Sequence, residues 1–99
     1  MSDYSVYLTE DARLVMLREL AAQTDGRLNE TILDAVLVSF GHRRSRDWIR
    51  TQLEALRELG AVTLTTAGNI TIASITRLGL DHVERRQIIT GVARPSPEA

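Results

Sequence analysis

The sequence predicts a small α+β domain that is mostly helical, with three helices, a β-hairpin and a last helix. Three observations predict this order. Apolar residues recur at helical spacing from Ala12 to Leu59, and a residue suited to capping precedes each predicted helix. From Val62 to Ile72 the spacing changes to the two-residue period of strands. Helical spacing returns after Thr76, with Leu80 and Val83 on the apolar side.

The length and composition indicate one small domain. The chain has 99 residues, of which 43% are hydrophobic and 25% charged, as in ordinary globular proteins. We expect an N-terminal arm over residues 1–9, which is either frayed or packed on a partner chain, and the domain over residues 10–90. Residues 91–99, which contain two prolines, are expected to form an extended, mobile tail. No apolar run is long enough to span a bilayer and the N-terminus has no signal-peptide pattern, so we expect a cytoplasmic protein without a membrane partner.

The first predicted helix starts at Thr9, which is expected to cap it, with two acidic residues in the first turn. Its apolar residues cover a wide arc, the pattern of a helix that packs against both a domain core and a dimer mate. A turn that ends at Gly26 follows. The second helix is expected to begin at Asn29 and to end at Gly41.

The third predicted helix covers residues 45–59. Ser45 is expected to cap it, and Ile49, Leu53 and Leu56 form one apolar stripe that ends at Gly60. The second helix, a short turn and the third helix form a helix-turn-helix pair. The predicted hairpin then takes the position of a wing, and its tip carries no basic residue. We therefore expect this hairpin to be structural more than a strong DNA contact.

Basic residues gather where the third helix begins. The arginine fork suits phosphate oxygens and the acceptor edge of guanine, and the first residues of the second helix of such a pair enter the major groove. A merely solvated helix face is the alternative, since Glu54 is spaced to pair with either Arg50 or Arg57. The candidate DNA-binding residues are Arg43, Arg44, Ser45, Arg46, Arg50 and Thr51.

The charge distribution argues against non-specific coating of nucleic acid. The net charge is −1, with three arginines against seven acids in residues 1–40, five against three in residues 41–60 and four against three in residues 61–99. Non-specific binding grows with the number of phosphates neutralised. The small basic surplus lies in the predicted third helix and the turn before it.

No motif for catalysis or metal binding is present in the sequence. There is no cysteine, and His42 and His82 are forty residues apart. We expect His42 to be a polar cap or a phosphate contact in the turn, and His82 to lie on a helix surface or an interface. Without a phosphate loop, a nucleophile motif or paired carboxylates, we expect no enzymatic activity, no cofactor and no metal.

The sequence resembles two groups of known proteins. Residues 10–86 resemble winged-helix domains of the MarR and ArsR type, through the passages LRELGAV and ITRLGLDHV. Nearly the whole chain is similar to a poorly characterised family of about 100-residue proteins of Mu-like phages and prophages, through EDARLVMLRELAAQ, RRSRDWIRTQLEALRELGAV and GVARPSPEA. By analogy with winged helices, the resemblance implies that Arg44, Arg46, Arg50 and Thr51 face the major groove.

Two functions remain open at this point. The first is a homodimeric regulator of phage or prophage transcription that binds double-stranded DNA through residues 45–59. The second is a winged-helix adaptor that binds a phage protein during morphogenesis or packaging, without strong DNA binding. The acidic total charge and the uncharged hairpin tip favour the second function.

Overall fold

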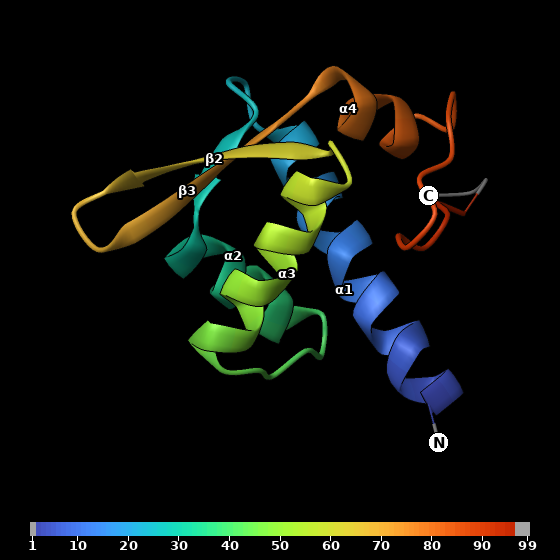
Figure 1. Cartoon of the computed structure of the whole chain (residues 1–99), viewed down its shortest axis with the longest axis horizontal. Coiled ribbons are helices and arrows are strands. Elements are labelled where there is room, and N and C mark those ends of the chain that lie inside the picture. Colours follow the sequence, from blue (N-terminus) through green and yellow to red (C-terminus); the bar gives the residue numbers. More distant parts are fainter. Residues whose placement is uncertain (1, 97–99) are drawn as a thin grey trace.

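The computed structural model describes residues 2–96. Across that range the fold is α+β and mostly helical, with four helices and one three-stranded antiparallel sheet (Figure 1). This confirms the predicted class. No helix in residues 2–96 is both long and apolar enough to cross a membrane. The elements in chain order are α1 (Ser2–Ala22), β1 (Arg27–Asn29), α2 (Glu30–Ser39), α3 (Arg46–Glu58), β2 (Val62–Ala67), β3 (Ile70–Ile75) and α4 (Arg77–Val83).

The core lies where α1, α2 and α3 meet beneath the sheet (Figure 1). The predicted apolar stripe of α3 is confirmed, because Ile49, Leu53 and Leu56 are all 0% exposed. Ser45 is the N-cap and accepts a hydrogen bond from the Trp48 amide at 3.1 Å. These residues fix which side of α3 faces the core, and so which side faces outward.

The sheet has the order β1-β3-β2, so the hairpin of β2 and β3 is joined to the rest of the fold through β1. Ala67 pairs with Ile70 across a two-residue turn. Gly68 has φ +62° in the first turn position, where glycine is favoured in tight hairpins. Asn29 closes β1 and caps α2 by accepting from the Ile32 amide at 2.9 Å. The start of α2 therefore lies beside the hairpin.

The predicted start of the first helix at Thr9 is wrong, because α1 begins at Ser2 and runs without a break through residues 2–9. Thr9 lies inside the helix and does not cap it. Residues 2–9 contain no glycine or proline that would stop a helix, and Leu8 and Thr9 are already half-buried. Packing of the following turns therefore extends the helix back past the predicted cap.

The described part of the C-terminal segment also differs from the expected extended tail. Helix α4 ends at Val83, and Arg85 has φ +64°, a left-handed conformation that stops the helix. The irregular segment after it packs on α1 and is not an extended tail from residue 91. Ile89 and Val92 are buried, and the Ala93 amide donates to the Glu10 carbonyl at 3.1 Å. Residues 97–99 of the predicted tail lie outside the described residues.

His82 was expected on a surface or an interface, but it is 1% exposed. The Ile89 amide donates to its Nδ1 at 3.0 Å, and its Nε2 is 2.9 Å from the Ala93 carbonyl oxygen. Because Nδ1 accepts, the ring proton is on Nε2, which donates to that carbonyl. The imidazole is buried because it supplies hydrogen bonds that hold the C-terminal segment against α4.

Candidate functional site

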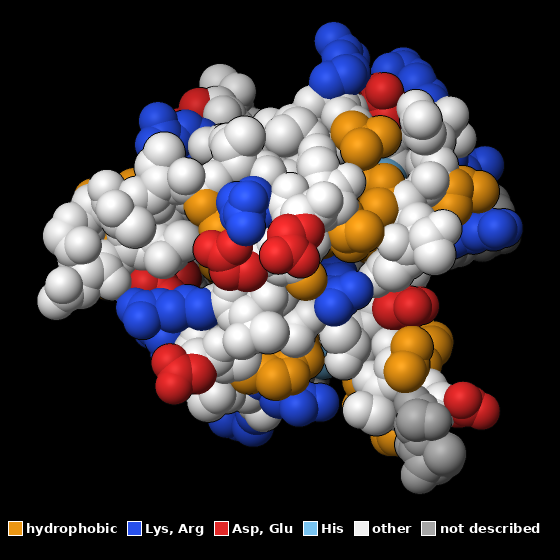
Figure 2. All heavy atoms as spheres, viewed as in Figure 1, with side chains coloured by type: hydrophobic (Ala, Val, Ile, Leu, Met, Phe, Trp, Pro, Cys, Tyr) orange, Lys and Arg blue, Asp and Glu red, His pale blue; other side chains and the backbone are white. Residues whose placement is uncertain are grey.

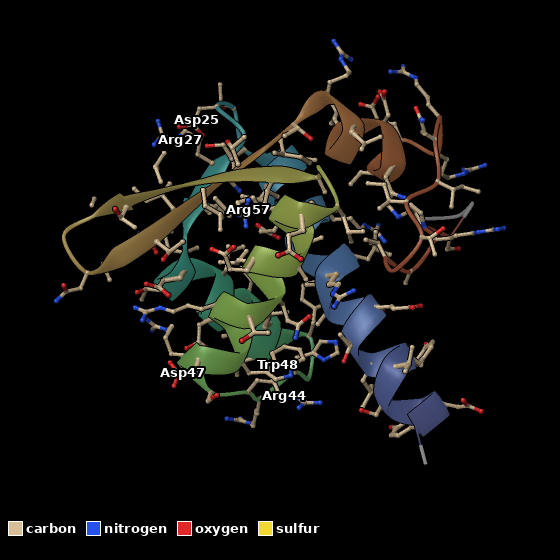
Figure 3. All side chains as sticks on the ribbon, viewed as in Figure 1. Asp25, Arg27, Arg44, Asp47, Trp48 and Arg57 are labelled. Carbon is tan, nitrogen blue, oxygen red and sulfur yellow. The ribbon has the colours of Figure 1, made fainter. Side chains whose placement is uncertain are left out.

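The six predicted DNA-binding residues lie in the turn before α3 and in the first two turns of that helix. Figure 3 shows Arg44 below the start of α3. Arg43 and Arg44 are exposed in the turn. Ser45 is occupied as the helix cap. Thr51 is exposed, and its hydroxyl donates to the Asp47 carbonyl at 3.0 Å. The chain therefore presents two exposed arginines, followed by a capped helix end.

Arg44 is held in place by an aromatic side chain. Its guanidinium lies 4.4 Å from the centre of the Trp48 ring, and the two side chains lie together below α3 in Figure 3. Such a contact stabilises a cation and leaves its N–H donors open to other ligands. Arg43 has no hydrogen bond or ion pair with any residue in the range 2–96. Both arginines are therefore available to an anionic ligand.

Arg50 has a different environment. Its Nε is 2.6 Å from one carboxylate oxygen of Glu30 and its NH2 is 2.9 Å from the other, in a bidentate pair. The same NH2 donates to the Asn69 carbonyl in the hairpin turn at 3.0 Å. Arg50 therefore joins α3 to α2 and to the hairpin, and its Nε and NH2 groups already have partners.

Glu30 is the residue of this region that sequence reasoning missed. Its side chain is 0% exposed, and besides Arg50 it accepts from the Thr71 amide at 2.9 Å. Hydrogen bonding to Arg50 lowers the pKa of Glu30; burial opposes this, and the Thr71 amide adds to the lowering. Glu30 is three and seven residues before Leu33 and Leu37, so it shares their apolar face. That spacing was a signal for a buried, paired acid.

The remaining arginines of α3 have weaker partners. Arg46 NH2 is 3.6 Å from Asp34, and the buried Nε of Arg46 has no hydrogen-bond partner in the described range. Arg57 pairs with Glu54 at 2.8 Å, which confirms one of the two ion pairs that the spacing allowed. Arg50 bonds to Glu30 instead of Glu54. Arg46 is thus intermediate between the open Arg44 and the paired Arg50, because it is half-exposed and its ion pair with Asp34 is long, at 3.6 Å.

Acidic side chains, from Asp47 in the first turn onward, share the exposed face of α3 with basic ones. Asp47, Glu54 and Glu58 are exposed there, together with Arg57. Figure 2 shows red and blue side chains mixed over this face, without a continuous basic surface. The hairpin tip, residues 66–69, adds no charged side chain. Within α3 and the turn before it, the exposed arginines without an acidic partner in residues 2–96 are therefore Arg43 and Arg44.

His42 was expected as a cap or a phosphate contact, but it points inward. It is 6% exposed, and its Nε2 is 2.8 Å from a carboxylate oxygen of Asp11 in α1. Its backbone amide donates to the Leu37 carbonyl at 2.8 Å. The ring can be buried because Asp11 supplies a hydrogen-bond partner. The contact between His42 and Asp11 anchors the turn that contains Arg43 and Arg44 against α1.

Two proteins are similar to this chain. The uncharacterized protein gp26 of Escherichia phage Mu is 40% identical over 92 residues, which cover 93% of this chain and 95% of the Mu protein. An uncharacterized protein of Haemophilus influenzae is 39% identical over 71 residues, or 71% of this chain and 69% of that protein. No protein-family model and no solved structure matches the chain. The expected kinship with a Mu phage protein is confirmed: the chain belongs to the family of phage Mu gp26.

Proposed function

We propose that this chain is a winged-helix protein that binds duplex DNA through the N-terminal end of α3. The order α2, turn, α3 and hairpin supports this proposal, because it is the order in which winged helices present a recognition helix and a wing. The observation that carries it is the pair Arg43 and Arg44, which are exposed where α3 begins and have no acidic partner in residues 2–96.

Each residue of the site then has a definite role. Arg43 and Arg44 bind phosphates, with Trp48 holding the second guanidinium in place. Arg46 and Thr51 face the major groove of the DNA. There Arg46 gives up its 3.6 Å contact with Asp34 and donates to an acceptor on the DNA instead. Arg50 positions the hairpin and α3 relative to each other, because its Nε and NH2 groups are committed to Glu30 and the hairpin turn.

The proposed binding depends on few phosphate contacts. In this region the exposed arginines without an acidic partner among the described residues lie in the turn before α3, and the exposed acids of α3, Asp47, Glu54 and Glu58, oppose a long contact with DNA. Each neutralised phosphate contributes to affinity and to its salt dependence. The chain is therefore a moderate binder whose affinity for a specific site comes from two copies on two half-sites, as in other paired recognition helices. Kinship with phage Mu gp26 supports the phage setting of this proposal.

The test is fluorescence anisotropy with fragments of the source genome at low salt. The wild-type chain, an Arg43→Ala/Arg44→Ala variant and an Arg57→Ala variant are compared. Arg57 is the matched control, because it is an exposed arginine of the same helix but pairs with Glu54. We expect the double variant to lose at least about tenfold in affinity, as two lost charged contacts imply, and the control to bind like wild type. Absence of wild-type binding to every fragment would refute the proposal.

A protein-binding adaptor is the second candidate. The exposed acids Asp47, Glu54 and Glu58 and the uncharged hairpin tip favour it, since they suit a protein surface better than a phosphate backbone. On this reading, Asp47→Ala/Glu54→Ala weakens capture of a phage partner in a pull-down from infected cells. On the DNA-binding reading, the same variant binds DNA more tightly, because two repelling charges are removed.

A further inference from the structure

The N-terminal end of α1 extends beyond the rest of the molecule (Figure 1). Tyr4 is 71% exposed, Val6 50% and Tyr7 61%. A helix end that packs against nothing is only marginally stable in water, and neighbouring exposed aromatics mark contact surfaces. Figure 2 shows hydrophobic side chains on this projecting end, separated from the main body by a notch.

A groove continues along the same helix toward its C-terminal half. It is a hollow of about 380 Å³. Leu14 and Val15 are buried at its base, and Phe40, at the end of α2, is 63% exposed beside it. At about 100° per residue, Tyr7, Leu14 and Arg18 lie within roughly 40° of one another around α1, and Tyr4 lies roughly 60° from Tyr7. The projecting aromatics and the groove therefore share one face of α1.

Opposite charges flank this face. Asp3 lies at its N-terminal end and Arg18 borders the groove. Neither side chain makes a hydrogen bond or ion pair with a described residue. One face of one helix thus carries projecting aromatics with an unpaired acid at one end. At the other end lies a groove with the unpaired base Arg18, lined by Leu14, Val15 and Phe40 together with Asp11 and Glu19.

We propose that a second copy of this chain docks on this face, with the two α1 helices antiparallel. A two-fold axis between positions 10 and 11 places Asp3 opposite the second copy's Arg18. The same axis places Tyr7 opposite the second copy's Leu14, because positions 7 and 14, like positions 3 and 18, lie equally far from the axis on its two sides. An interface of this kind is isologous, so each copy gives its aromatics and receives its neighbour's. This interface specifies how the two copies required by the proposed function contact each other, but the interface itself does not require DNA binding.

The axis has one unfavourable feature that makes the proposal more testable. It brings Glu10 and Asp11 of both copies near one another. Asp11 already has His42 as a partner at 2.8 Å, whereas no side-chain bond to Glu10 exists within the described chain. Like charges that approach across an interface weaken it. Glu10→Gln should therefore strengthen the dimer. If the two copies met through another surface, this substitution would not be expected to strengthen it.

The test is sedimentation equilibrium of the full chain, with circular dichroism to show that each variant is folded. We expect a dimer for the wild type. Asp3→Arg and Arg18→Asp should each raise the dimer dissociation constant at least about tenfold, and the double exchange should restore most of the affinity, because both pairs re-form with reversed signs. Tyr7→Ser should weaken the dimer similarly, and Glu10→Gln should lower the dissociation constant.

Two results would overturn this interface. One is a folded wild-type chain that stays monomeric at every concentration. The other is a dimer that the two single exchanges do not weaken, or that the double exchange does not restore. Failure here is distinguishable from failure of DNA binding: a monomer that shifts DNA anisotropy removes this interface alone. A dimer with the expected charge dependence that binds no DNA leaves the interface standing and removes the DNA-binding proposal.

Discussion

Arg44 and Arg50 are six residues apart, yet their surroundings make them chemically different. Arg44 rests on Trp48 in the turn and keeps its donors open. Arg50, in the middle of α3, donates to both carboxylate oxygens of Glu30 and to the hairpin turn. The difference comes from what the neighbouring elements supply, an aromatic ring in one case and a buried acid in the other. Arginines in a basic stretch are therefore not equivalent contributors to a binding surface.

The largest expected effect is the loss of stability in Arg50→Ala. This change leaves the Glu30 carboxylate buried without its bidentate partner, and only the Thr71 amide still donates to it. Arg43→Ala removes an exposed side chain that has no partner in residues 2–96 and should change stability by less than about 0.5 kcal/mol. Urea unfolding compares the two variants directly. Equal stability of both would mean that Arg50 is not structural.

The same comparison predicts a pH dependence. Glu30 has a pKa below its ordinary value of 4.5 because Arg50 and the Thr71 amide favour its charged form. Its contribution to stability is therefore present above pH 4.5, and it falls as the pH drops below 4.5 through the lowered pKa, because the unfolded state then binds the proton more readily. Unfolding free energies measured between pH 7 and acid should fall more steeply for wild type than for Glu30→Gln. Parallel curves would contradict the assignment.

A smaller effect is expected at the turn. Arg44→Ala removes the cation from the face of Trp48, a contact worth about 0.5–1 kcal/mol at exposed sites. The chain has one tryptophan, so its fluorescence reports on this contact without interference. The emission of Arg44→Ala should differ from wild type, whereas Arg57→Ala, at the other end of α3, should leave it unchanged. An emission spectrum insensitive to Arg44 would show that the stacked arrangement is not maintained in solution.

The helices and the hairpin were predictable because local signals specify them. The spacing of Ile49, Leu53 and Leu56 gave the buried side of α3, and Ser45 and Gly60 marked its ends. The chain ends were not predictable in this way. Thr9 carried a valid cap signal, but packing of α1 extended the helix past it. Ile89 and Val92 lie in a segment without periodicity and are buried only because α1 offers a surface to them.

The candidate site was predictable in position but not in the role of each residue. The sequence placed Arg43 and Arg44 in the turn before the helix and Arg46 and Arg50 in its first two turns, and they are there. Pairing of Arg50 with Glu30 joins residues twenty positions apart in different helices, so no local spacing on α3 indicates it. His42 is a similar case, because its partner Asp11 is thirty-one residues away in α1.

The most direct test of the account is the salt dependence of DNA binding by wild type, Arg43→Ala/Arg44→Ala and Arg57→Ala. If the two turn arginines bind phosphates, the slope of log affinity against log salt should be shallower by roughly 1.8 in the double variant, at about 0.9 for each lost phosphate contact on duplex DNA. The Arg57→Ala slope should equal that of wild type. Equal slopes in all three proteins, or no salt-dependent binding by wild type, would contradict the claim that the N-terminal end of α3 is a DNA-binding surface.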